Sequence, residues 1–313
     1  MLKLGESFFF LYMLMKTNYT KTCTLPQDLL PLLKQRGLTI SNEQKAISYL
    51  TNIGYFRLSA YLYPLLKEPK TEHSYKDGAT FDKALDMYRF DRKLRILFFN
   101  EIEKIEVAIR SAMNNLISDE LQDVFWATNP KYFRNPAIFA KTLTLIQTET
   151  AKNKEDFIAH FQSKYSNPYP PIWMITEIIP LGVLVNLCNN LANKSLLKKI
   201  AHQFGLPLPV FSSWIVLLVN LRNICGHHAR LWNREIPFIS HKLNNPKFAW
   251  INSDNTDMKR VYFRICVIKY LLFTVSPNNS FTQKLKSLLA EYPTVDIRAM
   301  GFPVNWENEP IWK

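Results

Sequence analysis

Glycine is scarce in this sequence, with 8 residues among 313, less than half of the usual share of about 7%. Collagen-like and multi-bladed β architectures are therefore excluded, because they need many glycines for turns with positive φ. Intrinsic disorder is excluded by the 47% of apolar and 13% of aromatic residues. The four cysteines form no CxxC pair, which argues against a zinc ribbon or a disulfide scaffold and fits a reducing cytoplasm.

Long hydrophobic runs are also lacking. The apolar run from Phe8 to Met15 is too short to span a bilayer, which takes about 20 residues. A signal peptide is the alternative, but Glu6 lies in the charged lead-in and no small-x-small cleavage site follows. Residues 1–24 are therefore expected to be an extension or a mis-assigned start, with the true start at Met13 or Met15, and no membrane partner is expected.

Apolar residues recur at helical spacing through most of the chain, and no alternating run is long enough to demand a sheet. This pattern predicts an all-α fold. One helix is expected from Trp173 to Leu191. No linker rich in Ser and Gly interrupts the sequence, so residues 25–313 are expected to form a single domain.

The longest helical pattern runs from Thr80, an N-cap candidate, to about Ser118, without Pro or Gly inside. At about 100° per residue, its apolar side carries Phe99 together with four charged residues. Charges on a core-facing side are unfavourable unless paired, and a spacing of four residues allows pairing within the helix. These charges form either a structural network or the support of an active site. They are Asp91, Arg95, Glu106 and Arg110.

A nearly all-apolar segment that follows two N-cap candidates, Ser212 and Ser213, ends in a cluster of polar residues. On a helical wheel Asn220, Asn223 and His227 lie within about 60°, and Arg222 lies about 100° from Asn223. Such a group suits metal-independent cleavage of an RNA phosphodiester. Histidine can exchange protons with the ribose 2′-OH and the leaving 5′-oxygen, and arginine can stabilise the negative charge of the transition state.

Each of these residues also has a structural interpretation. A histidine at the end of a helix is a favourable partner of the helix dipole, and a lone arginine is usually a salt-bridge residue. Zinc would recruit Cys225 with His227 or His228, but adjacent histidines on a helix point about 100° apart and no second ligand pair has suitable spacing. No metal or cofactor is therefore expected.

Arg222 with His227 resembles the R-x(4–6)-H signature of HEPN ribonucleases, and the stretch from Leu221 to Arg234 resembles the Abi-like (AbiD/AbiF) abortive-infection proteins. Five further stretches carry the same resemblance: Ile53–Tyr61, Tyr88–Arg95, Ile105–Arg110, Pro170–Trp173 with Glu177, and Met300–Trp306. The resemblance implies a HEPN-like helical bundle with additional N- and C-terminal helices, and an endoribonuclease toxin of bacterial phage defence. In such enzymes the site is often shared across a homodimer.

The resemblance also implies roles for individual residues. Arg222 would stabilise the phosphate, His227 would be the acid–base residue, and Asn223 would be the polar residue beside the arginine; the spacing also admits His228 as the catalytic imidazole. At Gly226 many relatives are expected to have Ala, so the helix is expected to loosen there. Three residues after the motif are expected to bind RNA: Arg230, Asn233 and Arg234.

We further infer that the long helix packs beside the motif, with Glu106 or Asp91 supporting Arg222 or a histidine, assisted by Arg95, Arg110 and Asn220. The charge distribution agrees with an RNA substrate, because Lys194 to Tyr270 holds a surplus of nine of the net thirteen positive charges.

The leading hypothesis is a cytoplasmic, homodimeric, metal-independent RNase toxin held inactive by an RNA or protein antitoxin. The alternatives are a non-catalytic RNA-binding or phage-sensing protein, and a structural helical scaffold.

Overall fold

The computed structural model describes residues 18–20, 22–252 and 256–313, and the Phe8–Met15 run lies outside them. The described residues contain no β-strand, so the all-α prediction is confirmed. Among the residues described, β-type contacts are limited to three isolated bridges, such as that between Phe133 and Leu191. The chain divides into two compact units with a boundary between Leu85 and Asp86. The single domain from 25 to 313 stays a prediction.

The first unit is a small helical cluster whose core contains buried apolar side chains such as Leu33, Leu58 and Tyr61. Helix α3 packs against both α2 and α4. Lys45 pairs with Asp82 on the first turn of α5, and the hydroxyl of Thr80 accepts the backbone N–H of Lys83 at 3.1 Å, which confirms Thr80 as an N-cap. The helices of this unit are α2 (Pro26–Gln35), α3 (Glu43–Ile53) and α4 (Tyr55–Leu62), with 3₁₀ turns at Tyr63–Leu65 and Lys70–Glu72.

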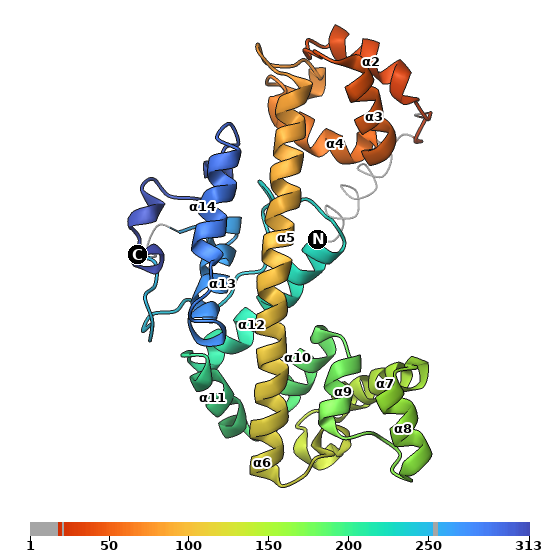
Figure 1. Cartoon of the computed structure of the whole chain (residues 1–313), viewed down its shortest axis with the longest axis vertical. Coiled ribbons are helices and arrows are strands. Elements are labelled where there is room, and N and C mark those ends of the chain that lie inside the picture. The colour runs from red at the N-terminus through yellow and green to blue at the C-terminus, as the bar shows by residue number, and fades with distance from the viewer. Residues whose placement is uncertain (1–17, 21, 253–255) are drawn as a thin grey trace, which may run out of the picture. The chain divides into compact units, whose positions relative to one another are not determined.

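Helix α5 (Phe81–Ala112) is the longest helix of the chain and continues into the second unit. The expected single helix to Ser118 is interrupted by a π-helical turn, Met113–Ile117, before α6 (Ser118–Leu121). Helices α7, α8 and α9 gather beside the end of α5 that leads into α6 (Figure 1). The remaining helices are α7 (Pro136–Lys152), α8 (Asp156–Lys164), α9 (Ile172–Ile178), α10 (Leu181–Asn190), α11 (Lys194–Gln203), α12 (Leu208–Gly226), α13 (Val261–Val275) and α14 (Phe281–Glu291), with 3₁₀ turns at Trp126–Thr128, Pro130–Tyr132, Arg298–Met300, Trp306–Asn308 and Pro310–Trp312.

The single helix expected from Trp173 to Leu191 is two helices, α9 and α10. Pro180 is the N-cap of α10, and Ile179 before it has extended backbone angles. Proline has no N–H to donate and disfavours the helical conformation of the residue before it, which ends α9. The break matters for the site because α9 can then lie at its own angle beside α5.

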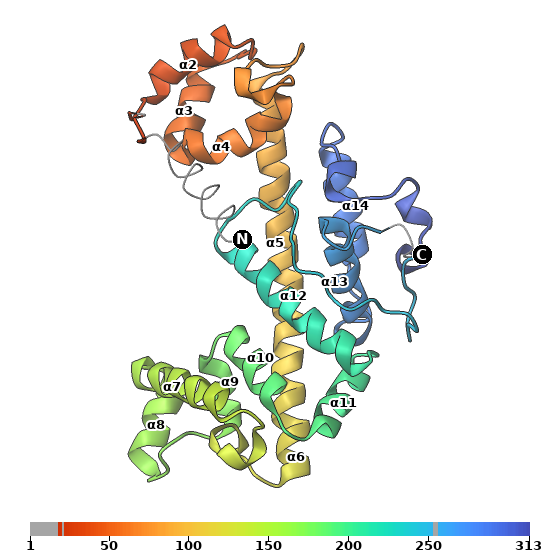
Figure 2. The same ribbon diagram turned by 180° about the vertical axis from the view of Figure 1, so that it is seen from behind.

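Helix α12 begins one turn earlier than Ser212 and Ser213 suggest, so their expected role as N-caps is wrong. Pro207 occupies the N-cap, and the hydroxyl of Ser213 donates to the carbonyl of Val210 at 2.9 Å inside the helix. Helix α12 packs against α10 and α11 (Figure 2). By length and composition it is the one helix of the described residues that could cross a membrane, and a buried core helix passes the same test.

The core of the second unit surrounds α13, of which most side chains are buried. Arg264 is 1% exposed within this core. Its guanidinium donates to the carbonyls of Ile236 at 3.0 Å and Phe238 at 2.9 Å, and burial lowers its pKa to about 10. These bonds attach α13 to the irregular segment that follows the polar cluster.

Candidate functional site

The polar cluster lies where α12 ends. The helix stops at Gly226, with His227 as its C-cap, and His228 follows with a positive φ of 55°. The N–H of Ala229 donates to the carbonyl of Ile224 at 3.0 Å, and the N–H of His228 donates to the carbonyl of Cys225 at 3.1 Å. This pair of bonds is a Schellman motif, which turns the chain sharply and presents two successive imidazoles at the end of the helix.

The helix was expected to loosen at Gly226, and α12 ends at this residue, but the glycine itself is not the cause. Its φ is not positive, and a Cβ added to it would lie 3.7 Å from the ring of Phe99, an ordinary contact. An alanine at this position would therefore fit. The helix ends because of the left-handed residue at 228, which breaks the helical hydrogen-bond pattern.

The side chains of Arg222, Asn223 and His227 are exposed. The guanidinium carbon of Arg222 lies 5.8 Å from the ring centre of Phe99 on α5, within cation–π range. Within residues 18–20, 22–252 and 256–313, the structure gives none of these three side chains a hydrogen bond or an ion pair. Asn220 is half-buried one turn earlier. Arg222 is therefore a cation that an external anion can reach.

Two of the four charges predicted on the apolar side of α5 form a buried ion pair between Asp91 and Arg95. Asp91 is 0% exposed. One of its carboxylate oxygens accepts the N–H of Leu231 at 3.0 Å and that of Trp232 at 2.5 Å. Arg95 donates to the carbonyl of Ala229 at 3.4 Å. The pair thus holds the backbone of the three residues that follow His228 closely in sequence, and α5 packs beside the motif as inferred.

The other two charges, Glu106 and Arg110, form an ion pair that is half-buried. Arg110 also donates to the carbonyls of Thr176 and, at 3.1 Å, of Ile179, at the end of α9. The carboxylate of Glu106 binds Arg110, and support of Arg222 or a histidine by Glu106 or Asp91 stays a prediction. The pair of Glu106 and Arg110 attaches α9 to α5.

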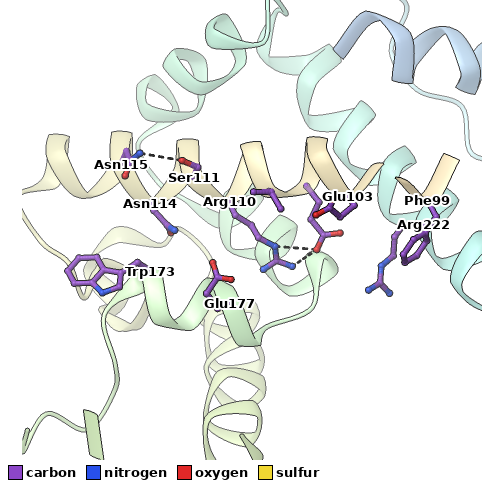
Figure 3. A pocket seen from close by; sticks show the side chains of 11 residues that line it. Phe99, Glu103, Arg110, Ser111, Asn114, Asn115, Trp173, Glu177 and Arg222 are labelled. Carbon is purple, nitrogen blue, oxygen red and sulfur yellow. Dashed lines mark hydrogen bonds and ion pairs between the residues drawn. The ribbon is translucent and has the colours of Figure 1, made fainter. Parts of the chain in front are cut away.

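A cavity of about 730 Å³ lies between α5, α9 and the end of α12. Figure 3 shows Arg222 beside Phe99 at one end of this cavity, Trp173 at the other, and Glu177 between them. Its lining combines carboxylates, guanidinium groups, amides and two aromatic rings. The residues are Phe99, Glu103, Glu106, Val107, Arg110, Ser111, Asn114, Asn115, Trp173, Glu177 and Arg222.

A second cavity of about 650 Å³ continues along α5, and Phe99 and Glu103 line both cavities. His228 and Arg92 line the second cavity, whereas His227 lines neither. The two candidate imidazoles therefore differ in surroundings: His228 faces a cavity next to the one that contains Arg222, and His227 lies on the exposed helix end.

The three residues expected to bind RNA after the motif are half-buried. The side-chain oxygen of Asn233 accepts from Arg260 at 3.4 Å, and Arg234 donates to the carbonyl of Arg230 at 3.4 Å. These hydrogen bonds stabilise the conformation of the segment after the motif. Contact of the three residues with RNA stays a prediction.

In the part of the chain that the structure describes, no group of three or more His, Cys, Asp or Glu residues could hold a metal ion. Cys225, the thiol considered for zinc, is buried, and burial raises its pKa to about 12. Zinc binds the thiolate form, so the surroundings of Cys225 work against this ligand.

Sequence reasoning missed several residues of the cavity. Phe99 was expected in the core but is 41% exposed. Trp173 and Glu177 were noted without a role in the site, and Glu103 was not considered. The available signal was the spacing of Trp173 and Glu177, since residues four apart share a helix face; their position opposite α5 depends on the packing of α9.

Fold and site together define an all-α protein that carries an Arg-x₄-His motif at the end of a core helix. The profile of the Abi-like protein family matches residues 48–233. This match covers more than half of the chain, and the chain belongs to the Abi-like family. No curated protein and no solved structure shows a significant match.

Proposed function

We propose that this Abi-like protein is a metal-independent endoribonuclease toxin that acts in abortive infection. The observation that carries the proposal is the exposed guanidinium of Arg222, which stands over Phe99 at the rim of a cavity without an ion pair in the described part of the chain. Two histidines follow at the end of the same helix. In this proposal Arg222 binds the phosphate, and one of the two imidazoles serves as the acid–base group, the role that histidine most often has in catalysis.

The proposed reaction is an internal transesterification. One imidazole takes the proton of the ribose 2′-OH, whose oxygen attacks the phosphorus, and the P–O5′ bond breaks as the leaving 5′-oxygen takes a proton from the imidazolium that has formed. The products are a 2′,3′-cyclic phosphate and a 5′-OH end. Arg222 stabilises the negative charge that grows on the phosphoryl oxygens. The spacing of the family motif favours His227 as the acid–base residue, whereas the position of His228 in the lining of the second cavity favours His228.

Cleavage of total RNA in the presence of EDTA tests the proposal. Wild-type protein is expected to produce fragments that end in 2′,3′-cyclic phosphate. Arg222→Ala should reduce the cleavage rate about 10²–10³-fold, and loss of the catalytic histidine about 10²–10⁴-fold. Arg222→Lys should recover part of the rate at most, because lysine keeps the charge but lacks the planar fork.

His202→Ala is the matched control, because His202 also lies exposed in the last turn of a helix, α11, outside the motif. A histidine that serves the helix dipole alone would affect stability at both places and cleavage at neither. Undiminished cleavage by Arg222→Ala, His227→Ala and His228→Ala would overturn the proposal. Stable RNA binding without fragments would identify a non-catalytic RNA-binding protein.

We extend the proposal to a cytoplasmic homodimer that an RNA or protein antitoxin keeps inactive. Support for a second copy comes from exposed apolar side chains of α5 that line the two cavities: Ile96, Phe99 and Val107. Light scattering of the purified protein tests the dimer, and a monomeric mass at micromolar concentration would exclude it. Digestion of the native complex with a nuclease or a protease distinguishes the two kinds of antitoxin.

A further inference from the structure

Helix α9 contributes an aromatic ring and a carboxylate to the lining of the 730 Å³ cavity. Trp173 and Glu177 are four residues apart, so both side chains point from the same side of the helix. Trp173 is 46% exposed, and within the described residues its ring stacks on no other aromatic ring. A large aromatic side chain held open at a cavity can stack against a ligand.

The charges of the cavity divide into a paired and an unpaired set. Glu106 and Arg110 neutralise each other. Glu103, Glu177 and Arg222 have neither an ion pair nor a side-chain hydrogen bond among the residues that the structure describes. The cavity therefore offers a guanidinium at one end and carboxylate oxygens along the way to Trp173 (Figure 3).

This arrangement selects the ligand by its chemistry. A plain polyanion would be repelled by the carboxylates, and a polyamine would be repelled by Arg222. A nucleic-acid strand fits both ends, because it carries phosphates for the guanidinium, N–H donors on its bases for a carboxylate, and flat rings for an indole. The volume lies within the range of about 300–1,000 Å³ that is usual for ligand cavities.

We propose that this cavity is a base-recognition subsite for single-stranded RNA, in which Glu177 reads a guanine and Trp173 stacks on a neighbouring base. The proposal rests on the proposed nuclease function, since the phosphate at Arg222 is taken to be the one that is cut. Guanine is the base with two adjacent donors, N1–H and the 2-amino group, on its Watson–Crick edge, and these match the two oxygens of a carboxylate. Adenine and cytosine place a ring-nitrogen lone pair beside their amino group, and uracil places carbonyls on both sides of N3–H.

Binding measurements test the subsite without depending on catalysis. The probes are 5′-fluorescein hexauridylates with one central base replaced by guanine, hypoxanthine, adenine or cytosine. They are titrated by fluorescence anisotropy into the His227→Ala/His228→Ala double variant, which leaves RNA uncut. We expect the guanine probe to bind at least about tenfold more tightly than the others, since a lost hydrogen bond to a charged group is worth about that factor. The hypoxanthine probe lacks the 2-amino group and isolates that single bond.

Variants assign the preference to its residue. Glu177→Ala should abolish the difference between the guanine and hypoxanthine probes, whereas Glu103→Ala, which removes the same charge from α5, should keep it. Trp173→Ala should lower the affinity for every probe about tenfold without changing the order of affinities, because stacking does not depend on base identity. Circular dichroism confirms that each variant is folded.

The outcomes separate the subsite from the nuclease. Equal affinity for all probes, or a guanine preference that survives in Glu177→Ala, would overturn the proposed subsite. If the wild-type protein still cleaves RNA in that case, the proposed nuclease function remains supported. A guanine preference without any cleavage would support the subsite and overturn the nuclease. Competition with free GMP identifies the source of the base: displacement at GMP concentrations near the Kd of the probe points to a mononucleotide, and resistance to GMP points to an RNA strand.

Discussion

At the scale of single residues, the carboxylate of Asp91 is fully buried and bound on several sides. It accepts two backbone N–H groups from Leu231 and Trp232 and pairs with Arg95, itself buried. A buried ion pair gains little over apolar packing, but loss of one partner leaves an uncompensated charge. The pair therefore fixes the position of the segment after the motif. Loss of either member is expected to lower the free energy of unfolding strongly.

Asp91→Ala is expected to lower the free energy of unfolding by about 3–5 kcal/mol, because it leaves Arg95 unpaired and two buried N–H groups without acceptors. Urea denaturation followed by circular dichroism measures the change. Lys93→Ala, which removes an exposed ion pair with Glu291, should shift the transition far less, since water screens that pair. Equal shifts for the two variants would contradict the role assigned to Asp91.

At the scale of elements, the end of α12 is held in a conformation that a non-glycine residue adopts at a cost. His228 sits at the left-handed position of the Schellman motif, where glycine is the usual residue and other residues lose roughly 1 kcal/mol. Strain of this kind is tolerated where a side chain is needed, which agrees with a functional imidazole at this position.

His228→Gly and His228→Ala both remove the imidazole, so their difference isolates the backbone. The glycine variant should be more stable than the alanine variant by about 1 kcal/mol, because glycine adopts a positive φ without the Cβ clash. Chemical denaturation of both proteins measures the difference. Equal stability would mean that the left-handed turn is not retained in solution.

Local rules predicted the elements well where a single helix decides the outcome. The N-cap at Thr80 and the two i, i+4 ion pairs of α5 are confirmed, because they depend on the 3.6-residue period alone. The predictions failed at two prolines: Pro207 caps α12 one turn before the predicted serines, and Pro180 splits the predicted helix after Trp173.

At the scale of the whole molecule, the tertiary structure decides which of the positive charges after Lys194 are buried, which are paired and which stay exposed. Arg264 is enclosed in the core by backbone carbonyls. Lys199 and Lys259 form ion pairs with Glu120 and Glu235. Arg222 is exposed and has no ion pair among the described residues, so its charge stays available to an external anion.

The packing of the chain also separates its thiols. Cys188, Cys225 and Cys266 are buried and Cys23 is exposed. Burial raises the pKa of all three buried thiols, that of Cys225 to about 12, which leaves about one thiolate in a thousand at pH 9. Reaction with Ellman's reagent at pH 8 should therefore show one fast thiol in the native protein and four in guanidinium chloride. A rise to pH 9 should not expose a second fast thiol, and its appearance would contradict this packing.

The sequence by itself determined the helical fold class, the N-cap at Thr80, the ion pairs within α5 and the polar cluster at the end of α12, because each depends on residues within a few turns of one another. The tertiary structure decided that Asp91 supports residues 140 positions further along the chain, that Phe99 faces a cavity, and that Trp173 and Glu177 line the same cavity as Arg222. Helical periodicity says which side chains share a face, whereas the partner of that face depends on how distant helices pack.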